Sequence, residues 1–202
     1  MATTANKTTD VKKVSDTLNA AFLPGPVDKF QFSNCSQELI NNFYFKRVQQ
    51  FIEADSEIIE INDFNAVAIW VAPGKTYPSA QWDEPNECVD EFKKKAKVII
   101  EDYQYDKIPH WTLVFIGKDP SQNKGSISPL INPYLSKAKE QDVPVLLFAV
   151  NDHAKDIYIH FGFKVLATIK IGEGKVDSNG DRDSNGVGLA VYMMAYNHKD
   201  RE

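Results

Sequence analysis

The sequence predicts a mixed α/β (α+β) fold in which helices flank a central, mostly antiparallel sheet. Two observations carry this prediction. Segments with helical spacing of apolar residues alternate along the chain with short runs rich in β-branched residues. In the second half, two strongly apolar runs are separated by a helical segment, which is typical of a parallel strand–helix–strand unit. We expect a single domain over residues 10–197, with polar segments at 1–9 and 198–202.

The expected helices are recognised by their apolar spacing and their end signals. The first begins after Asp10, whose side chain can cap it, and keeps its spacing to Phe22. Pro24-Gly25-Pro26 ends this helix. Two later helices are expected at about 34–53 and 86–103. Another should end at about Gln141, and a short one should cover 152–161.

Strands are expected where the apolar period becomes two or the apolar run becomes continuous. "EIIEI" and "AVAIWVA" lie on either side of "NDFN" and predict a hairpin. "HWTLVFIG" and "PVLLFAV" are nearly continuous apolar runs, as in strands that are buried on both faces. "FKVLATIKI" and "GLAVYMMAY" predict the last two strands, which are joined by "GEGKVDSNGDRDSNG".

That joining segment is rich in Asp and Asn, which raises the question of a calcium site. A calcium loop that starts at Asp177 would place Arg182 where a glycine is required. The same loop would place Gly188 where a bidentate Glu is required. The pattern therefore predicts a solvated, mobile hairpin end and no calcium site.

Composition and charge limit the class of protein. Of the 202 residues, 43% are hydrophobic and 25% charged, which is ordinary for a soluble globular domain. The net charge of −5 and the lack of a basic stripe argue against a nucleic-acid partner. Cys35 and Cys88 have no metal-ligand or redox spacing, which indicates a reducing compartment and no metal. With no targeting signal or membrane-length apolar run, we expect a cytoplasmic monomer or homodimer without a membrane partner.

The loop "DPSQNKGSISPLINP" connects a buried strand to a helix. Such a connection points backbone N–H groups and the positive end of a helix at one place, which favours phosphate. Gln122, Lys124 and Gly125 have the spacing of a phosphate-binding turn. An ordinary structural turn explains these residues equally well, so the loop alone leaves both interpretations open.

The order of elements resembles the GNAT superfamily of acetyl-CoA-dependent N-acetyltransferases, whose pyrophosphate loop reads Q/R-x-x-G-x-G/A. "QNKGSI" is similar to that loop, and in "DIYIHFGFKV" Tyr158 precedes Gly162-Phe163 by the family's spacing. "TLNAAF", "AVAIW", "NPYLSKAKEQDVPVLL" and "FGFKV" resemble stretches of the puromycin N-acetyltransferase-like group in the same order. The resemblance extends over residues 10 to 195, roughly the whole chain.

The resemblance implies an activity and a set of residues. It implies a parallel strand pair that splays apart to form the acetyl-CoA cleft, with acetyl-CoA as co-substrate and no metal. A primary amine of a small molecule or amino-acid-like acceptor would attack the thioester directly, and Tyr158 would give a proton to the leaving thiolate. The implied cofactor-binding residues are Phe115, Ile116, Gly117, Gln122, Asn123, Lys124, Gly125, Ser126, Ile127 and Ser128.

Several residues depart from the family pattern. Ile127 replaces the second small residue of the loop, and Pro129 follows it. Ala154 stands where the family often has an Asn, and Phe148 where the puromycin enzymes have a Glu suited to act as a base. These departures favour an alternative, in which a catalytically weakened GNAT-fold protein binds acyl-CoA or a protein partner without turnover.

The acceptor pocket is the least determined part of the site. His110 titrates in the range of a base, and Trp82 can stack on an acceptor, so both are candidates for a substrate pocket. Trp70 and Trp111 fit a core role at least as well as a stacking role. Asp83 and Glu84 lie in a loop where they can line an amine pocket or simply face solvent.

Overall fold

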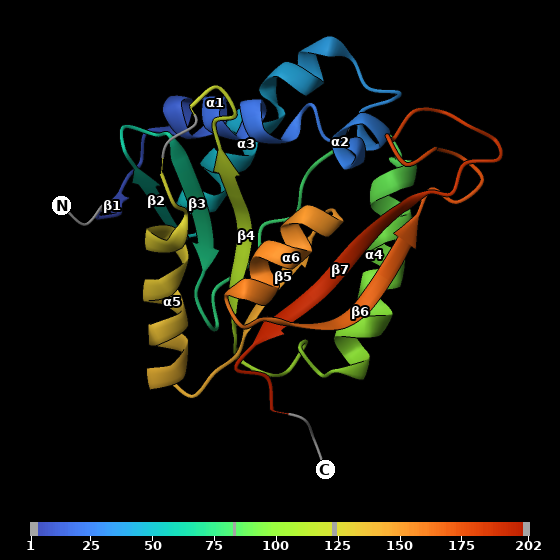
Figure 1. Ribbon diagram of the computed structural model, residues 1–202. Helices are drawn as coiled ribbons and strands as arrows, with labels where there is room; N and C mark the ends of the chain where they lie inside the picture. The colour runs from blue at the N-terminus through green and yellow to red at the C-terminus, as the bar shows by residue number, and fades with distance from the viewer. Residues whose placement is uncertain (1–3, 83, 123–124, 200–202) are drawn as a thin grey trace.

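The computed structural model describes residues 4–82, 84–122 and 125–199. Helices and strands alternate along the chain as Figure 1 shows. The strands are β1 (Asn6–Lys7), β2 (Glu57–Ile61), β3 (Ala66–Val71), β4 (Trp111–Lys118), β5 (Val145–Ala149), β6 (Lys164–Ile171) and β7 (Leu189–Tyr196). The helices are α1 (Val11–Phe22), α2 (Pro26–Gln31), α3 (Gln37–Glu53), α4 (Glu87–Asp102), α5 (Ser128–Glu140) and α6 (Asp152–His160).

All seven strands of the described chain form one sheet in the order β1-β2-β3-β4-β5-β7-β6. Among these strands of the described residues, only β4 and β5 pair in parallel; the other neighbours are antiparallel. The predicted mixed, mostly antiparallel sheet is therefore confirmed.

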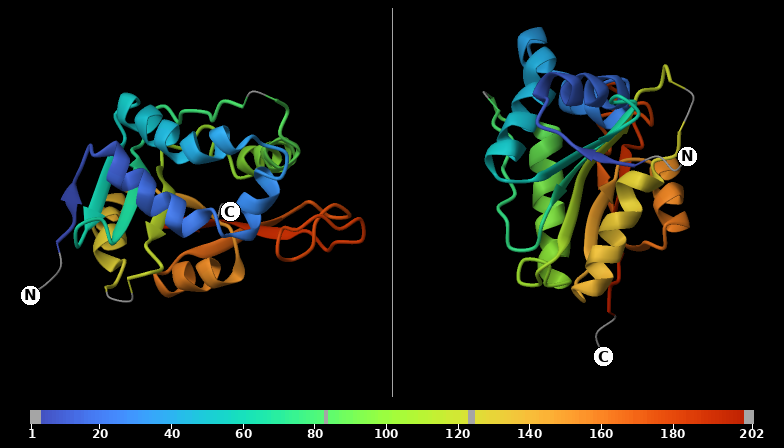
Figure 2. Two further views of the ribbon diagram at one scale, coloured as in Figure 1. Left: turned by 90° about the horizontal axis from the view of Figure 1, so that it is seen from above. Right: turned by 90° about the vertical axis from the view of Figure 1, so that its left-hand side faces the viewer.

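Helices cover both faces of this sheet (Figure 2). On one face α5 and α6 pack over the centre of the sheet. On the other, α1 and α3 cover β2 to β4, while α2 and α4 cover β6 and β7. Each face has its own apolar cluster, which explains why the central strands are apolar on both sides.

Side-chain caps fix the starts of four helices. Asp10, Ser36, Asn86 and Asn151 each accept a hydrogen bond from a backbone N–H in the first turn of the helix that follows. These bonds satisfy N–H groups that have no partner inside the helix. The cap at Asp10 and the approximate limits of these helices agree with the sequence predictions.

The parallel strands separate at one end, as predicted. β4 and β5 pair only at Trp111–Val145, Thr112–Leu146 and Leu113–Leu147. β4 then continues to Lys118, and the end of β5 pairs only with β7. The sheet is thus split between the carboxyl ends of its two parallel strands.

A bulge in β4 lies at the start of this split, and the sequence analysis missed it. The register against β3 shifts, so that Ile69 pairs with Phe115 and the next residue, Trp70, pairs with Leu113. Val114 is the extra residue of the bulge and has no partner residue on β3. Leu113 packs toward α5, whereas Val114 and Phe115 both pack toward α1 and α3. A bulge bends its strand and increases the local twist, which helps β4 to diverge from β5.

Two short elements were also missed. β1 adds an edge strand to β2, with Asn6 opposite Glu60, so part of the segment assigned as a polar extension belongs to the sheet. α2 begins at Pro26, the residue taken only as the end of the preceding helix. Proline is suited to the first turn of a helix, because its φ is already helical and its missing N–H is not needed there.

The hairpin end between β6 and β7 is exposed over residues 178–179 and 181–185, as predicted, but the rest of the segment is not simply solvated. Val176, in the middle of this segment, is buried with Phe30 of α2. A Cβ on Gly180 would lie 2.1 Å from the carbonyl oxygen of Pro26, so the segment lies directly against α2. Arg182 pairs with Glu87 of α4 at 3.0 Å. Residues 172–188 therefore cover one side of the molecule at the open end of the sheet.

Candidate active site

The open edge of β4 is the first part of the site. Among the described residues, β4 has no strand partner on its β5 side beyond Leu113. Phe115, Ile116 and Gly117, predicted to hydrogen-bond a cofactor through their backbone, lie on this stretch. Gly117 is needed for packing as well, because a Cβ there would lie 3.0 Å from Cβ of Ala21 on α1.

The loop after β4 is a turn organised by Asp119. The backbone N–H of Asp119 donates to the carbonyl of Asn65 at 2.9 Å, which ties the loop to the β2–β3 turn. Its carboxylate accepts bonds from Ser121, which lower the pKa of Asp119, and from the side chain of Gln122 at 3.2 Å. Gln122 is thus held by the loop itself; Asn123 and Lys124 lie outside the described residues.

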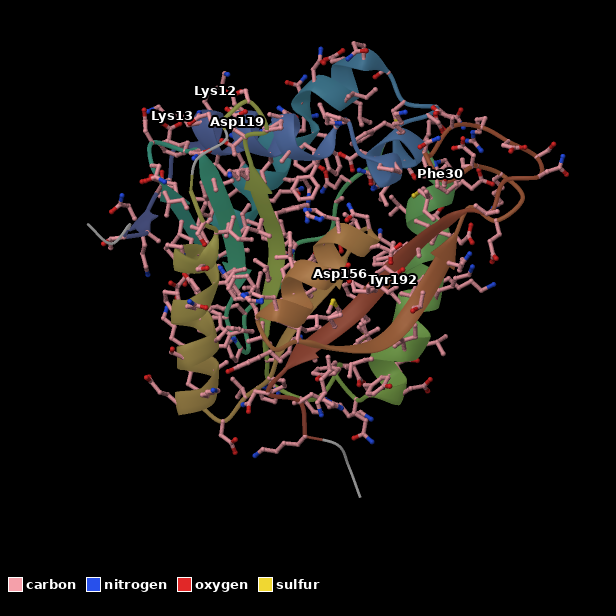
Figure 3. The ribbon with its side chains drawn as sticks, in the orientation of Figure 1. Lys12, Lys13, Phe30, Asp119, Asp156 and Tyr192 are labelled. Atoms are coloured by element: carbon pink, nitrogen blue, oxygen red, sulfur yellow. The ribbon has the colours of Figure 1, made fainter. Side chains whose placement is uncertain are left out.

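The same end of the molecule carries basic residues. Figure 3 shows Lys12 and Lys13 of α1 near Asp119. Lys13 lies 3.2 Å from Asp63 in the β2–β3 turn. Lys118, at the end of β4, donates to the carbonyl of Gly125 at 3.2 Å. Lys12 is paired with Asp16, as Lys13 is with Asp63, so carboxylates balance these two ammonium groups at this end.

The start of α5 offers fewer N–H groups than the sequence analysis expected. The N–H of Ser128 donates to Oγ of Ser126 at 3.1 Å, and Pro129 has none. Gly125 has φ +113°, which favours glycine. Ile127 is half-buried and packs against the apolar cluster beneath α5, so its side chain has a packing role.

Tyr158 lies on α6, on the same face of the sheet as α5. It is 8% exposed and packs with Leu147 and Ala149 at the split end of β5. Burial raises the pKa of Tyr158 well above its usual value, so the phenol stays protonated at neutral pH. Within the part of the chain that the structure describes, no hydrogen bond engages its hydroxyl.

α6 is held over the sheet by side chains at its first turns. Tyr192 of β7 donates its hydroxyl to Asp152 at 2.7 Å. Lys155 lies 4.6 Å from the centre of the Tyr192 ring and 2.6 Å from Asp152. Figure 3 labels Tyr192 and Asp156 in this region. These contacts fix the helix that carries Tyr158.

On the opposite face, α2 carries a buried carboxylate that the sequence analysis missed. Asp28 is 6% exposed; it accepts hydrogen bonds from the hydroxyl of Tyr44 at 2.7 Å and from the amide of Gln31 at 2.8 Å. Burial raises the pKa of Asp28 to about 6, although the Tyr44 bond opposes that rise. Pro26 and an acidic residue two positions later are the signal of a helix start that could have revealed α2.

The neighbours of Asp28 connect it to both diverging strands. The ring of its partner Tyr44 is 5.6 Å from the ring of Phe115, directly after the β4 bulge. Phe30, on the same short helix, belongs to the cluster against which Phe148 of β5 packs. Figure 3 shows Phe30 between α2 and the upper end of α4. α2 is thus connected to β4 through Tyr44 and shares an apolar cluster with β5.

Two hollows flank α2. One of about 420 Å³ is lined by residues that include Asp28, Phe32 and Arg182. The other, of about 330 Å³, is lined by residues that include Trp82 and Cys88. Burial and then the charge of Asp28 raise the pKa of the Cys88 thiol to about 12.

The predicted pocket residues lie apart from one another. Trp82 contacts Phe32 and Phe43, with ring centres 5.9 and 5.1 Å away, and its Nε1 is buried without a partner in the described chain. His110 precedes the closed end of the parallel pair, where it bonds the carbonyl of Ile108 at 2.6 Å and burial lowers its pKa. The structure does not bring His110 to the split. Glu84 is exposed beside Trp82, and Asp83 lies outside the described residues.

Trp70 and Trp111 are core residues. Trp70 is fully buried, stacks on Tyr134 with ring centres 4.3 Å apart, and donates to the carbonyl of Leu130. Trp111 is buried and donates to Gln141 at 2.8 Å. Phe148 of β5 packs edge-on against Phe92. An aromatic side chain therefore occupies the position at which the resemblance implies a carboxylate base.

Neither a metal centre nor a membrane span is found in the described segments. No group of three or more His, Cys, Asp or Glu side chains there is placed to hold a metal ion. Of the helices in those segments, none has the length and apolar character needed to cross a bilayer.

The sheet order, the single parallel pair and its split define the GNAT fold of acetyltransferases. Arylalkylamine N-acetyltransferase 2 from Aedes aegypti has this fold, with a TM-score of 0.64 over 97% of this chain and 99% of that chain at 14% identity. Residues 6–76 match the family described as the YOR012W acetyl transferase domain.

Sequence relatives define the family more narrowly. The Saccharomyces cerevisiae protein YDR391C is 32% identical over 216 residues, covering 99% of this chain and 89% of that protein. The chain belongs to the same family as YDR391C. The Schizosaccharomyces pombe N-acetyltransferase C550.08 is 24% identical over 174 residues, covering 76% and 70%.

Proposed function

We propose that the protein is an acetyl-CoA-dependent N-acetyltransferase that acts on a primary amine of a small molecule or amino-acid-like acceptor. The observation that carries this proposal is the free edge of β4 beyond Leu113, directly before the loop that enters α5. The pantetheine arm of acetyl-CoA contains amide groups, which can pair with such an edge as an added strand does. The backbone of Phe115 to Gly117 would hold this arm.

The other residues predicted for the site would bind the pyrophosphate of acetyl-CoA or protonate the leaving thiolate. The loop at Gln122 to Ser128 would receive the pyrophosphate, with the N–H groups of Gly125, Ser126 and Ile127 as donors. Tyr158 would protonate the thiolate of the leaving coenzyme A, because its buried phenol holds its proton at neutral pH.

Direct attack by the amine is favoured over an acyl-enzyme. A thiolate is the reactive form of cysteine, and the raised pKa of Cys88 keeps that thiol protonated. The amine would therefore form its bond to the acetyl carbon in one displacement.

The acceptor is proposed to carry an aromatic or apolar body. The aromatic side chains of Phe32, Phe43 and Trp82 gather beside the hollows at α2, where such a body can stack. Similar proteins named for arylalkylamine acetylation have the same fold. The likeness to puromycin N-acetyltransferases stays a prediction.

A second candidate function follows from the start of α5. The N–H of Ser128 is already bonded and Pro129 has none, so the pyrophosphate would receive fewer hydrogen bonds there. This favours the alternative of a GNAT-fold protein that binds acyl-CoA or a protein partner without turnover.

Two measurements decide between these functions. Acetyl-CoA at about 100 times its Kd should stabilise the protein by about 2.7 kcal/mol. A panel of alkylamines, arylalkylamines, polyamines and amino acids should then show amine-dependent release of free thiol for at least one class. Binding without release for any amine supports the second candidate. No binding of acetyl-CoA contradicts the first candidate and leaves, of the second, only the binding of a protein partner.

A further inference from the structure

Asp28 is a buried carboxylate to which the described part of the chain supplies no cationic partner. Among the described residues its hydrogen bonds come only from Tyr44 and Gln31, both uncharged. Burying a carboxylate without a cation is costly, so such groups are frequent at functional sites. Neither the cofactor loop nor Tyr158 gives Asp28 a role.

The surroundings of Asp28 leave room for a cation. Each carboxylate oxygen can accept two hydrogen bonds, and each accepts one here. Asp28 is among the residues that line the hollow of about 420 Å³.

The charged and titratable groups around it come from four elements. Lys29 of α2 is paired with Asp181 at 3.4 Å, and Arg182 with Glu87. Tyr44 of α3 and Cys88 of α4 remain protonated, because burial raises the pKa of each. Asp28 is therefore the group in this cluster that changes charge near neutral pH.

We propose that Asp28 binds the ammonium group of the acceptor and takes its proton before attack. This role rests on the proposed acetyl transfer. Asp28 lies on the side of the sheet opposite Tyr158. It is connected to β4 through Tyr44 and Phe115, while Phe30 of the same helix belongs to the cluster beside Phe148 of β5. The acceptor thus approaches the thioester from the α2 face, while the cofactor lies on the α5–α6 face.

The proton and electron balance of this step is complete. The ammonium gives one proton to the Asp28 carboxylate, and the neutral nitrogen uses its lone pair to form the bond to the acetyl carbon. The carbon–sulfur bond breaks and its electron pair leaves on sulfur. A second nitrogen proton goes to the sulfur through Tyr158 or water, one stays on the amide, and Asp28 returns its proton to solvent.

The competing explanation is that Asp28 only ties α2 to α3 through Tyr44. The two explanations differ in what they predict for acceptors of different basicity. A base is needed for an alkylamine, which is protonated at neutral pH, and is not needed for an aromatic amine, which is neutral. A structural tie affects both acceptors alike.

The test compares Asp28→Asn with the wild type on one alkylamine and one aromatic amine across pH. We expect kcat/KM for the alkylamine to fall by roughly 10²–10⁴-fold and for the aromatic amine to change far less. The acid limb of the alkylamine profile, near pH 6 in the wild type, should disappear. Glu60→Gln is the matched control, because it alters an equally buried carboxylate on β2 away from the split.

A second variant keeps the proposal testable if Asp28→Asn does not fold. Tyr44→Phe removes a hydrogen bond that stabilises the charged carboxylate, so the acid limb should move to higher pH. Equal losses for both amines, or an acid limb unmoved in Tyr44→Phe, would overturn the role of Asp28. A wild type that acetylates no amine of the whole panel would instead refute the acetyl transfer, and this role with it.

Discussion

At the scale of single residues, the protein has two buried acidic groups, a carboxyl and a phenol, on opposite faces of the split sheet. Asp28 and Tyr158 both have a raised pKa because they are buried, but with opposite consequences. Tyr158 stays neutral and keeps a proton to give, whereas Asp28 becomes charged above about pH 6 and can accept one. Environments that separate the titration of two groups in this way are typical of acid–base pairs.

The raised pKa of Asp28 predicts a pH-dependent cost in stability. Between 3.8 and about 6 the native state holds this proton while the unfolded state has lost it, so stability falls as pH rises through that window. The rise corresponds to about 3 kcal/mol at neutral pH. Asp28→Asn should therefore be more stable than the wild type in urea unfolding at about pH 8, and nearly equal to it at about pH 4. Parallel stability curves for the two proteins would contradict this account.

For Tyr158 the expected effect is on turnover alone. Tyr158→Phe removes only the hydroxyl, for which the described chain shows no hydrogen bond, so stability and acetyl-CoA affinity should barely change. If the phenol protonates the leaving thiolate, kcat should fall by roughly 10²–10⁴-fold. An unchanged kcat in steady-state kinetics would show that the thiolate leaves unaided or through water.

At the scale of elements, the sequence predicted correctly those helices, strands and caps that depend on neighbouring residues in the chain. The cap at Asp10, the hairpin after Glu57 and the strand–helix–strand run are encoded in consecutive residues, and the structure has them. α2 was missed because six residues hold too little periodicity, and the bulge at Val114 because it depends on pairing with β3.

The loop between β4 and α5 carries an element-scale prediction. Gly125→Ala places a side chain at a φ of +113°, which strains the backbone, and its Cβ would lie 3.1 Å from the side-chain amide nitrogen of Asn62. We expect acetyl-CoA affinity, measured by calorimetry, to fall by roughly tenfold, or ~1.4 kcal/mol. Gly74→Ala is the control, because it has a similar φ of +78° in open space after β3. Equal affinity in both variants would identify the loop as an ordinary turn.

At the scale of the whole molecule, long-range packing places the acceptor side of the site. The sequence predicted the order of elements and, by resemblance, the cofactor side. It did not predict that residues 172–188 would pack on α2, or that Asp28 would meet Tyr44, because these contacts join segments far apart in the chain. Val176 lies within a polar run, and its burial depends on Phe30, which no local pattern reports.

The central claim is that the split between β4 and β5 transfers an acetyl group directly to an amine. The most direct measurement uses acetyl-CoA with an isotopically labelled acetyl group and follows amide, coenzyme A and protein by mass spectrometry. The account predicts one labelled amide for each coenzyme A released, only when amine is present, with no label on the protein. Coenzyme A release without labelled amide, or label retained on the protein, would contradict it.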